Sequence, residues 1–389
     1  MLSLSSSLKY TANLIGQRIY FLGSDNFTKF FYLDVSYLFD AINPPFIYLP
    51  TKIPNESWSI TSIGGFNHTT IFLFGGTNNS YYAIDTNKLD EYNYNYNNVS
   101  TVDTINLENF PELRRIGASS VVNPLGQIFI FGGYSIKDND AFTWYNDTII
   151  LDIIDTIKLS WTIYTDAPIL RSGHTATLMD DGRILYIGGF DSSFNYVPMD
   201  QISIFDTNTS SWNLLTADGS VPSSRSEHSA VLVMQNAEII IYGGLRQDST
   251  LPPTPTLAVL TYGKTFTWIT QIVNGNRPPI LHSHNAILVG DLMIVALGNK
   301  TESQQILNES DLNIYVLNTT NFTWITTFTP PSLYSNITNI PPDNNSPNVA
   351  FIFILSFIGL IILVVFLLVT IICLYRCRRK RKVGIATSN

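Results

Sequence analysis

The stretch "HTATLMDDGRILYIGGF", His174 to Phe190, contains a short apolar run that ends in a pair of glycines. Five other apolar runs also end at a glycine, and the first glycines after the six runs are Gly23, Gly75, Gly132, Gly188, Gly243 and Gly298. Their successive separations are 52, 57, 56, 55 and 55 residues. A period of this length, built from strand-forming residues, predicts a β-propeller in which each repeat forms one blade.

The apolar runs are typical of strands that are buried on both faces. Residues 128–131, 184–187 and 239–242 are apolar at every position rather than at alternate positions, as expected for strands that lie between two neighbouring blades. Each run follows a polar turn and an earlier strand, and two further strand-like segments come after it. The pattern therefore predicts four strands per repeat and six repeats in one closed domain.

The glycines and tryptophans of the repeats are expected to have structural roles. Glycine permits φ angles and close backbone approaches that a Cβ atom would forbid. Four pairs are intact, namely Gly75 with Gly76, Gly132 with Gly133, Gly188 with Gly189, and Gly243 with Gly244. A tryptophan follows most repeats and suits the space between adjacent blades; the clearest examples are Trp161, Trp212, Trp268 and Trp324.

These residues resemble the kelch repeat, which belongs to the propeller group that includes the central domain of galactose oxidase. The matching features are the glycine pairs, the downstream tryptophans and the "R-S-x-H" openings at residues 171–174 and 225–228. The first repeat has Gly23-Ser24 and the sixth has Gly298-Asn299 in place of a pair. The resemblance covers roughly residues 9–328 and implies an all-β, six-bladed kelch-type β-propeller, which we assign to residues 1–328.

A single transmembrane α-helix is predicted after the propeller. Residues 349–372 form a run of 24 residues without a charge, which would reach about 36 Å as a helix and exceeds the hydrocarbon core of about 30 Å. We assign the helix to residues 349–375 and a Pro/Asn/Ser-rich stalk to residues 329–348. Six of the seven residues at 376–382 are basic, so residues 376–389 are expected to form a cytoplasmic tail and the propeller to lie on the extracellular or lumenal side.

The acceptor motifs for N-glycosylation agree with this topology. All 13 N-x-Ser/Thr motifs precede the apolar run, and the candidates singled out are Asn55, Asn146, Asn208 and Asn336. The sequence begins without an apolar leader, so we expect the natural amino terminus to be longer. The alternative topology is a cytosolic scaffold that is held on an organelle by a tail anchor.

The net charge limits the classes of ligand that are expected, and the cysteines indicate a possible lipid modification. Without the six basic residues of the tail, 16 basic residues face 30 acidic ones, a net charge of −14, which disfavours nucleic acid as a ligand.

Both cysteines, Cys373 and Cys377, lie at the end of the apolar run and in the basic segment. They are candidates for palmitoylation, with reduced cytosolic thiols as the alternative.

No catalytic, cofactor or metal site is predicted in the propeller. The resemblance to galactose oxidase would imply a copper site with a tyrosine crosslinked to a cysteine, and the first cysteine of this chain is Cys373. The three histidines His174, His228 and His284 recur once per repeat, which favours a structural role over metal binding. The repeated arginines, Arg171, Arg225 and Arg115, are expected to pair with carboxylates or cap turns rather than to attract an acidic partner.

We therefore interpret the chain as a membrane-anchored, non-catalytic propeller that binds a protein or a glycan. Loops positioned by a rigid scaffold commonly carry recognition, and a propeller exposes such loops on two rims. The alternative from another class is a galactose-oxidase-like secretory enzyme, which bound copper and a radical absorption band would support.

Overall fold

The computed structural model gives the propeller at residue level. It describes residues 10–23, 29–49, 59–64, 68–75, 81–86, 99–101, 114–137, 141–152, 160–248, 251–301 and 312–331. The chain divides into two units, Met1–Tyr334 and Ser335–Asn389, and the described residues all belong to the first. The predicted transmembrane helix, the tail, both cysteines, Gly76, Asn55 and Asn336 lie outside the described residues. Within the described ranges, no helix has the length and apolarity needed to cross a membrane.

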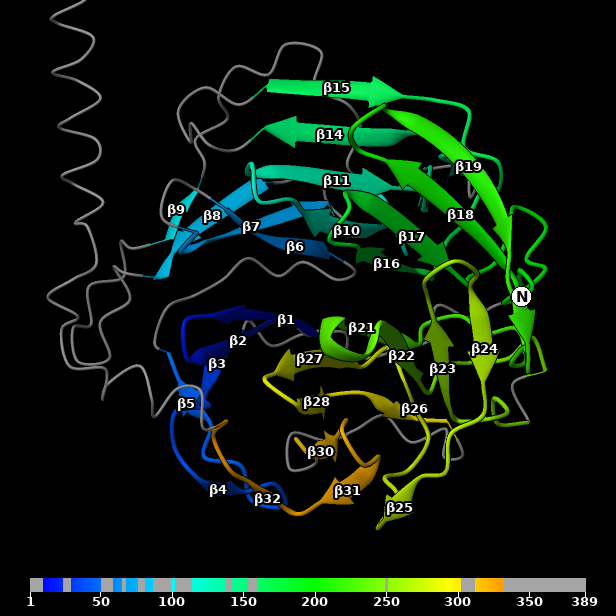
Figure 1. Cartoon of the computed structure of the whole chain (residues 1–389). Coiled ribbons are helices and arrows are strands. Elements are labelled where there is room, and N and C mark those ends of the chain that lie inside the picture. Colours follow the sequence, from blue (N-terminus) through cyan, green and yellow to red (C-terminus); the bar gives the residue numbers. More distant parts are fainter. Residues whose placement is uncertain are drawn as a thin grey trace, which may run out of the picture. The chain divides into compact units, whose positions relative to one another are not determined.

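The first three sheets, which we call blades 1 to 3, each contain four strands (Figure 1). Blade 1 consists of β1 (Tyr10–Ile15), β2 (Arg18–Gly23), β3 (Lys29–Asp34) and β5 (Ile47–Tyr48). Blade 2 consists of β6 (Ser59–Gly64), β7 (Thr70–Gly75), β8 (Tyr81–Asp85) and β9 (Val99–Thr101). Blade 3 consists of β10 (Ser119–Val122), β11 (Gln127–Phe131), β14 (Thr148–Asp152) and β15 (Ser160–Tyr164).

Blades 4 to 6 follow the same antiparallel order, and blades 5 and 6 each gain a fifth, parallel strand at the outer edge. Blade 4 consists of β16 (Thr175–Leu178), β17 (Arg183–Ile187), β18 (Gln201–Asp206) and β19 (Ser211–Thr216). Blade 5 consists of β21 (Ser229–Val233), β22 (Glu238–Tyr242), β23 (Leu257–Thr261), β24 (Thr267–Ile269) and β20 (Asp218–Gly219). Blade 6 consists of β27 (Asn285–Val289), β28 (Leu292–Ala296), β30 (Ile314–Asn318), β31 (Thr323–Ile325) and β25 (Asn274–Gly275).

Three short strand pairs and one helical turn complete the described elements. The pairs are β12 (Tyr134–Ile136) with β13 (Phe142–Trp144), β26 (Leu281–His282) with β29 (Asn299–Lys300), and β4 (Phe39–Asp40) with β32 (Thr327–Phe328). A 3₁₀ turn, η2 (Met234–Asn236), joins β21 to β22. The described chain is thus almost entirely strand and turn, and the predicted all-β propeller is confirmed.

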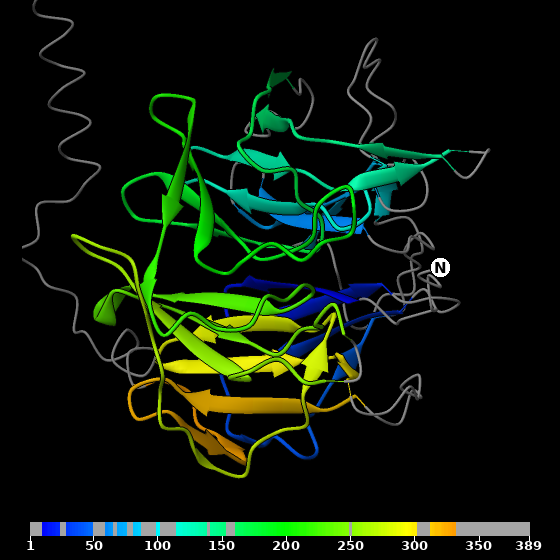
Figure 2. The same cartoon turned by 90° about the vertical axis from the view of Figure 1, so that its right-hand side faces the viewer.

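The six sheets form a ring around their first strands. Each inner strand contacts the inner strand of the next blade, in the order β1, β6, β10, β16, β21, β27 and back to β1. In Figures 1 and 2 the blue first sheet accordingly lies beside the yellow and orange sixth sheet. Because blade 1 is built from N-terminal residues and blade 6 from C-terminal ones, their contact closes the ring.

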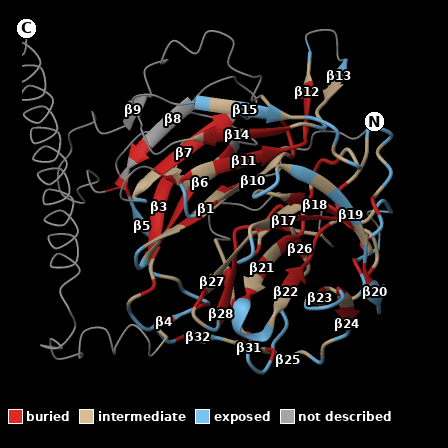
Figure 3. Cartoon of the chain, turned by 45° about the horizontal axis from the view of Figure 1, so that its top comes forward, coloured by how far each residue is buried: buried red, intermediate tan, exposed pale blue. Residues whose placement is uncertain are grey.

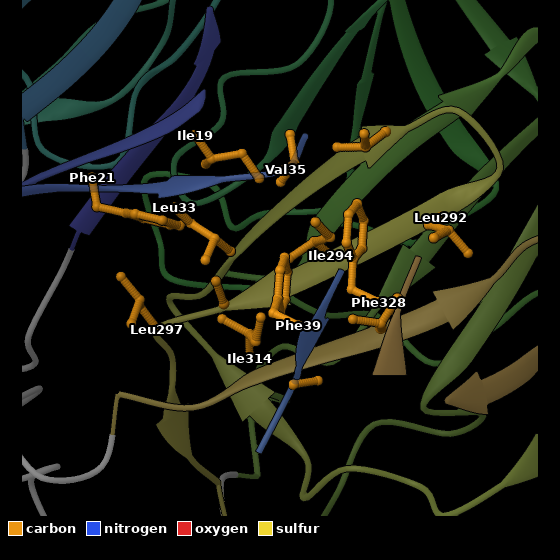
Figure 4. Packing of buried hydrophobic residues seen from close by; sticks show 14 of the residues in the cluster. Ile19, Phe21, Leu33, Val35, Phe39, Leu292, Ile294, Leu297, Ile314 and Phe328 are labelled. Carbon is orange, nitrogen blue, oxygen red and sulfur yellow. The ribbon is translucent and has the colours of Figure 1, made fainter. Parts of the chain in front are cut away.

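Closure of the ring is stabilised by apolar packing and strand pairing. The rings of Phe39 and Phe328 stack at 4.7 Å, where β4 pairs with β32. They belong to a buried cluster that also includes Ile19, Leu33 and Ile294 from blades 1 and 6 (Figure 4). Among the described strands, this pairing joins the two ends of the propeller, and blades 1 and 6 exchange no outer strand.

Burial follows the position of a strand within its blade. The second strands β11, β17 and β22 each end in four consecutive buried residues, as the unbroken apolar runs of the sequence predict. The outer strands β15 and β19 alternate between exposed and half-buried residues (Figure 3). A strand between two blades needs apolar side chains on both faces, whereas an outer strand needs them on one.

The tryptophans of the outer strands pack back toward the preceding blade. Trp268 of β24 joins a cluster that contains Leu185 and Ile187 of blade 4, and its indole Nε1 donates a hydrogen bond to Met199 O at 3.1 Å. Trp324, Trp212 and Trp161 occupy the equivalent places in the clusters between blades 5 and 6, 3 and 4, and 2 and 3.

Candidate functional site

The glycine pairs occur where each blade meets the next. A Cβ atom on Gly132 would lie 2.5 Å from the carbonyl oxygen of Arg171 in blade 4, and one on Gly243 would lie 2.1 Å from that of Leu281 in blade 6. The second glycine then donates its N–H to the same carbonyl, as Gly133 does to Arg171 O at 2.8 Å. These close backbone contacts, together with φ angles near +70°, explain why the apolar runs end in two glycines.

The pair after β17 shows that both of its positions exclude a side chain. A Cβ atom on Gly188 would lie 2.6 Å from the carbonyl oxygen of Arg225 in blade 5, and Gly189 N donates to that same oxygen at 2.9 Å. A Cβ atom on Gly189 would lie 2.6 Å from Ser172 O in the turn that opens blade 4. Gly189 also has a φ of 84°. The first glycine therefore makes room for the next blade, and the second makes room for the opening turn of its own blade.

In the sixth repeat, the glycine occupies a different position from the one that the sequence predicts. Leu297, with a φ of 57°, stands directly after β28 where the other repeats have their first glycine. Gly298 matches the second glycine, because its Cβ would lie 2.4 Å from His284 Cβ, as that of Gly244 would lie 3.0 Å from His228 Cβ. Leu297 is buried in the cluster between blades 6 and 1, so the predicted register at Gly298 was wrong by one residue.

The repeated histidines connect neighbouring inner strands. Each shares a hydrogen bond through Nε2 with a hydroxyl of the preceding blade; the pairs are Ser119 with His174 at 2.7 Å, Thr175 with His228 at 3.3 Å, and Ser229 with His284 at 2.8 Å. Burial lowers the pKa of His284 to about 3 and that of His228 well below its usual range. Buried and spread over three blades, these histidines have the structural role that their spacing predicts.

The repeated arginines are also internal. Arg171 is completely buried, and its guanidinium donates to the carbonyl oxygens of Gly188 at 2.9 Å and of Gln201 at 2.6 Å. Arg225 donates to carbonyls at the corresponding places in blade 5. Burial lowers the pKa of both groups to about 9, so both remain cations at neutral pH. Their contacts fix the loops after the glycine pairs, in agreement with the structural interpretation.

A series of backbone hydrogen bonds links the turns that precede the inner strands of blades 3 to 6. Gly173 N donates to Gly117 O, Glu227 N to Gly173 O, and Ser283 N to Glu227 O, at 2.8, 2.8 and 2.9 Å. All four residues have positive φ, with values of 70°, 67°, 54° and 53° in chain order. We call the surface formed by turns 115–118, 171–174, 225–228 and 281–284, with the segments that follow the glycine pairs, the loop face.

The loop face carries a polar cluster where blades 5 and 6 meet. His282 Nδ1 lies 3.3 Å from Glu227 Oε2 and 3.2 Å from Ser283 Oγ. The hydroxyl of Ser283 donates a short hydrogen bond to the same carboxylate oxygen. The side chains of Glu227 and His282 are 17% and 16% exposed, so the cluster is only partly accessible to solvent.

An aromatic cluster lies on the loop face of blades 3 and 4. Its members are Tyr134, Phe142, Trp144, Phe190, Phe194 and Tyr196. The rings of Tyr134 and Trp144 are 4.8 Å apart, and those of Phe190 and Phe194 stack at 5.8 Å. Phe142 is 48% exposed. The strands β12 and β13, which project from blade 3 in Figure 3, supply half of the cluster.

The carboxylate of the polar cluster affects the pKa values of two phenols in the aromatic cluster. Burial, and then the charge of Glu227, raise the pKa of Tyr134 to about 12. Burial and the same carboxylate also raise the pKa of Tyr196. The phenols therefore stay neutral at all physiological pH values, and a negative charge lies beside an aromatic surface.

The polar cluster does not have the geometry of a nucleophilic triad. In a triad the imidazole separates the serine from the carboxylate and contacts each through a different nitrogen. Here Ser283 bonds directly to Glu227, and His282 contacts both through Nδ1. Among the described residues, no three His, Cys, Asp or Glu side chains converge on a possible metal position. Within the described ranges, the polar cluster therefore has neither the arrangement of a nucleophilic triad nor that of a metal site.

The structure places two of the glycosylation candidates on the surface. Asn146 and Asn208 are exposed, and Asn208 Nδ2 donates a hydrogen bond to Asp181 O at 3.0 Å. Asn299, which also has the acceptor motif, is 6% exposed. Occupancy at these positions remains a prediction.

Sequence reasoning did not single out Glu227, Ser283 or the aromatic cluster. The segment "LHSHN" at residues 281–285 offers His282 and His284 as a possible chelating pair, but His284 is buried in the blade contact, where it shares a hydrogen bond with Ser229. The usable signal was the third residue of the "R-S-x-H" opening, which is Gly173 in one repeat and Glu227 in the next.

Comparison with known families gives a match over most of the chain. The KLHDC2/KLHL20/DRC7 Kelch-repeats domain matches residues 9–244 and 195–338. A solved structure titled "Structure of YjhT" superposes with a TM-score of 0.51 at 16% identity, over 72% of this chain and 85% of that one. This second likeness supports the propeller fold.

Several curated proteins are similar over part of their length. Kelch domain-containing protein 3 of Rattus norvegicus is 28% identical over 205 residues, 49% of this chain and 50% of that protein. Acyl-CoA-binding domain-containing protein 5 of Arabidopsis thaliana is 25% identical over 239 residues, 60% of this chain and 35% of that protein. The flagellar outer arm dynein alpha chain of Chlamydomonas reinhardtii is 28% identical over 170 residues, 42% of this chain and 4% of that protein. The chain thus spans half or less of the length of these relatives.

Proposed function

Because the chain belongs to the KLHDC2/KLHL20/DRC7 Kelch-repeats domain family, we propose that it is a non-catalytic module that binds a protein partner through its loop face. The observation that supports this most directly is the contrast between repeated and unrepeated residues. Glycines, histidines and arginines recur from blade to blade and fix the backbone. The polar and aromatic clusters occur once each among the described residues, on a face held by that framework.

The composition of the loop face fits protein recognition. Partly exposed aromatic side chains supply contact area at a small entropic cost, and they are enriched at the centres of protein interfaces. Half-buried Trp144 and Phe194, with exposed Phe142, provide such a surface. A glycan ligand would use the same aromatic faces, and the experiment below distinguishes the two.

Proximity labelling with the full chain in its native cells tests the proposal. The Phe142→Ala/Phe194→Ala variant removes two aromatic side chains from the loop face. The matched control, Leu125→Ala/Met234→Ala, removes two exposed apolar side chains, 68% and 59% exposed, from turns at the far end of the inner hairpins of blades 3 and 5. We expect a set of labelled proteins to disappear with the first variant and to persist with the control.

Two results would count against a protein-binding loop face. One is a labelled set that is the same for the wild type and both variants. The other is a loss of labelling with the loop-face variant that is also seen when the glycans of the partners are removed enzymatically. That result would indicate a glycan ligand instead.

We also propose that the propeller is membrane-anchored, with the propeller extracellular or lumenal and residues 376–389 cytoplasmic. The uncharged run at 349–372, the basic residues after it and the acceptor motifs before it support this. Retention in the membrane pellet after alkaline carbonate, with a mobility shift after N-glycosidase treatment, is the expected result. Retention without a shift would favour a tail-anchored cytosolic scaffold, and release by carbonate would exclude an anchor.

A further inference from the structure

Glu227 occupies a backbone position that disfavours its side chain. The equivalent residues in blades 3 and 4 are Gly117 and Gly173, and all three have positive φ. A residue with a Cβ atom is strained in this region, and such strain in a folded protein is characteristic of functional positions. The repeat could be built with glycine at residue 227, as it is in two other blades, so backbone geometry does not require the carboxylate.

Two neighbours of Glu227 hold its side chain in place. The hydroxyl of Ser283 and the Nδ1 atom of His282 both approach Oε2. Glu227 is a smaller cause, after burial, of the raised pKa of Tyr134 and Tyr196. The carboxylate is thus held in place, and the Glu227 side chain is 17% exposed.

An aromatic surface lies directly beside this carboxylate. The ring of Phe190 packs over Gly173, where an added Cβ would lie 3.1 Å from Phe190 Cε1, and the carbonyl of Gly173 accepts the N–H of Glu227. Tyr196 contacts Phe190 edge to face, with ring centroids 5.9 Å apart. Phe190 is therefore separated from Glu227 by a single residue, Gly173, in the series of hydrogen-bonded turns.

We propose that Glu227, with Phe190 and Tyr196 beside it, binds a cationic side chain, the ammonium of a lysine or the guanidinium of an arginine, presented by the protein partner. A carboxylate supplies charge-assisted hydrogen bonds to such a group, and aromatic rings attract it through their faces. This inference names the ligand chemistry of the proposed protein-binding face, and therefore rests on that proposal.

Three arginines of the loop face are already paired within the chain, although half-buried Arg246 also lies there, and the overall charge of the chain is acidic. The guanidinium groups of Arg171 and Arg225 are spent on carbonyls inside their own blades and are completely buried. Arg115 pairs with Asp147 through two hydrogen bonds of 2.9 Å. Acidic residues outnumber basic ones 30 to 16 outside the basic tail segment, so the long-range field also attracts a basic partner.

Selection of linear peptides from a random-sequence phage library, using the purified full chain, tests the inference. We expect the enriched peptides to share one lysine or arginine at a fixed position. A synthetic peptide from this set should lose at least tenfold in affinity when that lysine is acetylated, and the same amount when Glu227→Gln replaces the carboxylate. The matched control is Glu238→Gln, which makes the same change of charge at the other end of blade 5 and should leave affinity unchanged.

The Glu227→Gly variant keeps the test valid if the glutamine variant folds poorly, because glycine suits the positive φ at this position. It should fold at least as well as the wild type and still lose the lysine dependence. Peptides that require Phe142 and Phe194 but bind equally well when acetylated, or equally well to Glu227→Gln, overturn the cation site and leave the proposed function intact. Failure of every enriched peptide to depend on the loop face overturns the proposed function itself.

Discussion

Acidification is expected to weaken the propeller through its buried histidines, and His284 gives the clearest magnitude. Burial lowers the pKa of His284 to about 3, whereas a histidine in the unfolded chain has a pKa of about 6.5. The folded state therefore binds fewer protons than the unfolded state between these two values, so stability falls as the pH falls. The contribution is complete above pH of about 6.5 and is lost progressively from there toward pH of about 3.

The size of the effect follows from the shift. Each pKa unit corresponds to about 1.36 kcal/mol, so lowering the pH to about 5 reduces the free energy of unfolding by about 2 kcal/mol through His284 alone. The pKa of His228 is lowered in the same direction by burial, and its contribution has the same sign. Carboxylates add their own pH dependence, which is common to the wild type and to a His284 variant.

The measurement is denaturant unfolding of the full chain, followed by tryptophan fluorescence, at pH 7, 6 and 5. The His284→Gln variant should be less stable at pH 7 by about 1–2 kcal/mol, because it alters the hydrogen bond with Ser229 and the packing against Gly243. Between pH 7 and 5 it should lose about 2 kcal/mol less than the wild type does. Equal losses in the two proteins would refute the assignment of a depressed pKa to a buried, neutral His284.

Three further substitutions test the packing, each by the same unfolding measurement at pH 7. Gly243→Ala should lower the free energy of unfolding by about 2–4 kcal/mol, because its Cβ would overlap a carbonyl of the next blade. The control Gly263→Ala, whose Cβ would meet no atom within 4 Å, should stay within about 0.5 kcal/mol of the wild type. Similar costs at the two sites would contradict the close contact between blades 5 and 6 at Gly243. Trp268→Phe should cost about 2–3 kcal/mol through a lost hydrogen bond and a partial cavity, and a neutral result would mean that the indole does not fill the blade interface. Phe328→Ala should cost about 3–5 kcal/mol because it opens the cluster that closes the ring, and unchanged stability would show that the β4–β32 pairing is dispensable.

The fold was predictable because the physical demands of a propeller repeat along the chain. A strand buried between two blades must be apolar on both faces, and residues 184–187 and 239–242 show this without ambiguity. The glycine pairs were informative for a related reason, since the carbonyl of the next blade leaves no room for a Cβ atom. Such constraints act on single residues and are therefore visible in a sequence.

The register of the sixth repeat was not predictable in the same way. Leu297 adopts the positive φ of a first glycine, and it is stabilised by the apolar cluster that forms when blade 6 meets blade 1. That cluster combines residues from both ends of the propeller, including Phe39 and Phe328. A contact between such distant segments leaves no local pattern, so the glycine at 298 was matched to the wrong position.

The candidate site contains residues that repeat visibly in the sequence and residues whose role depends on contacts between blades. The "R-S-x-H" openings were recognised as repeats. The variable third residue, Glu227 in blade 5, belongs to the polar cluster. Its role depends on backbone hydrogen bonds between neighbouring turns, which form only when the blades assemble. Glu227 and Leu297 are both side chains held at positive φ where a repeat elsewhere has glycine. For Leu297 the surrounding core accounts for the exchange, because a large apolar side chain fills the closing cluster. Glu227 instead stands at a half-buried surface position, where packing does not call for a large side chain. Its carboxylate contacts Ser283 and His282 of the next blade and remains partly exposed, and a positively charged group is the ligand that we propose for it.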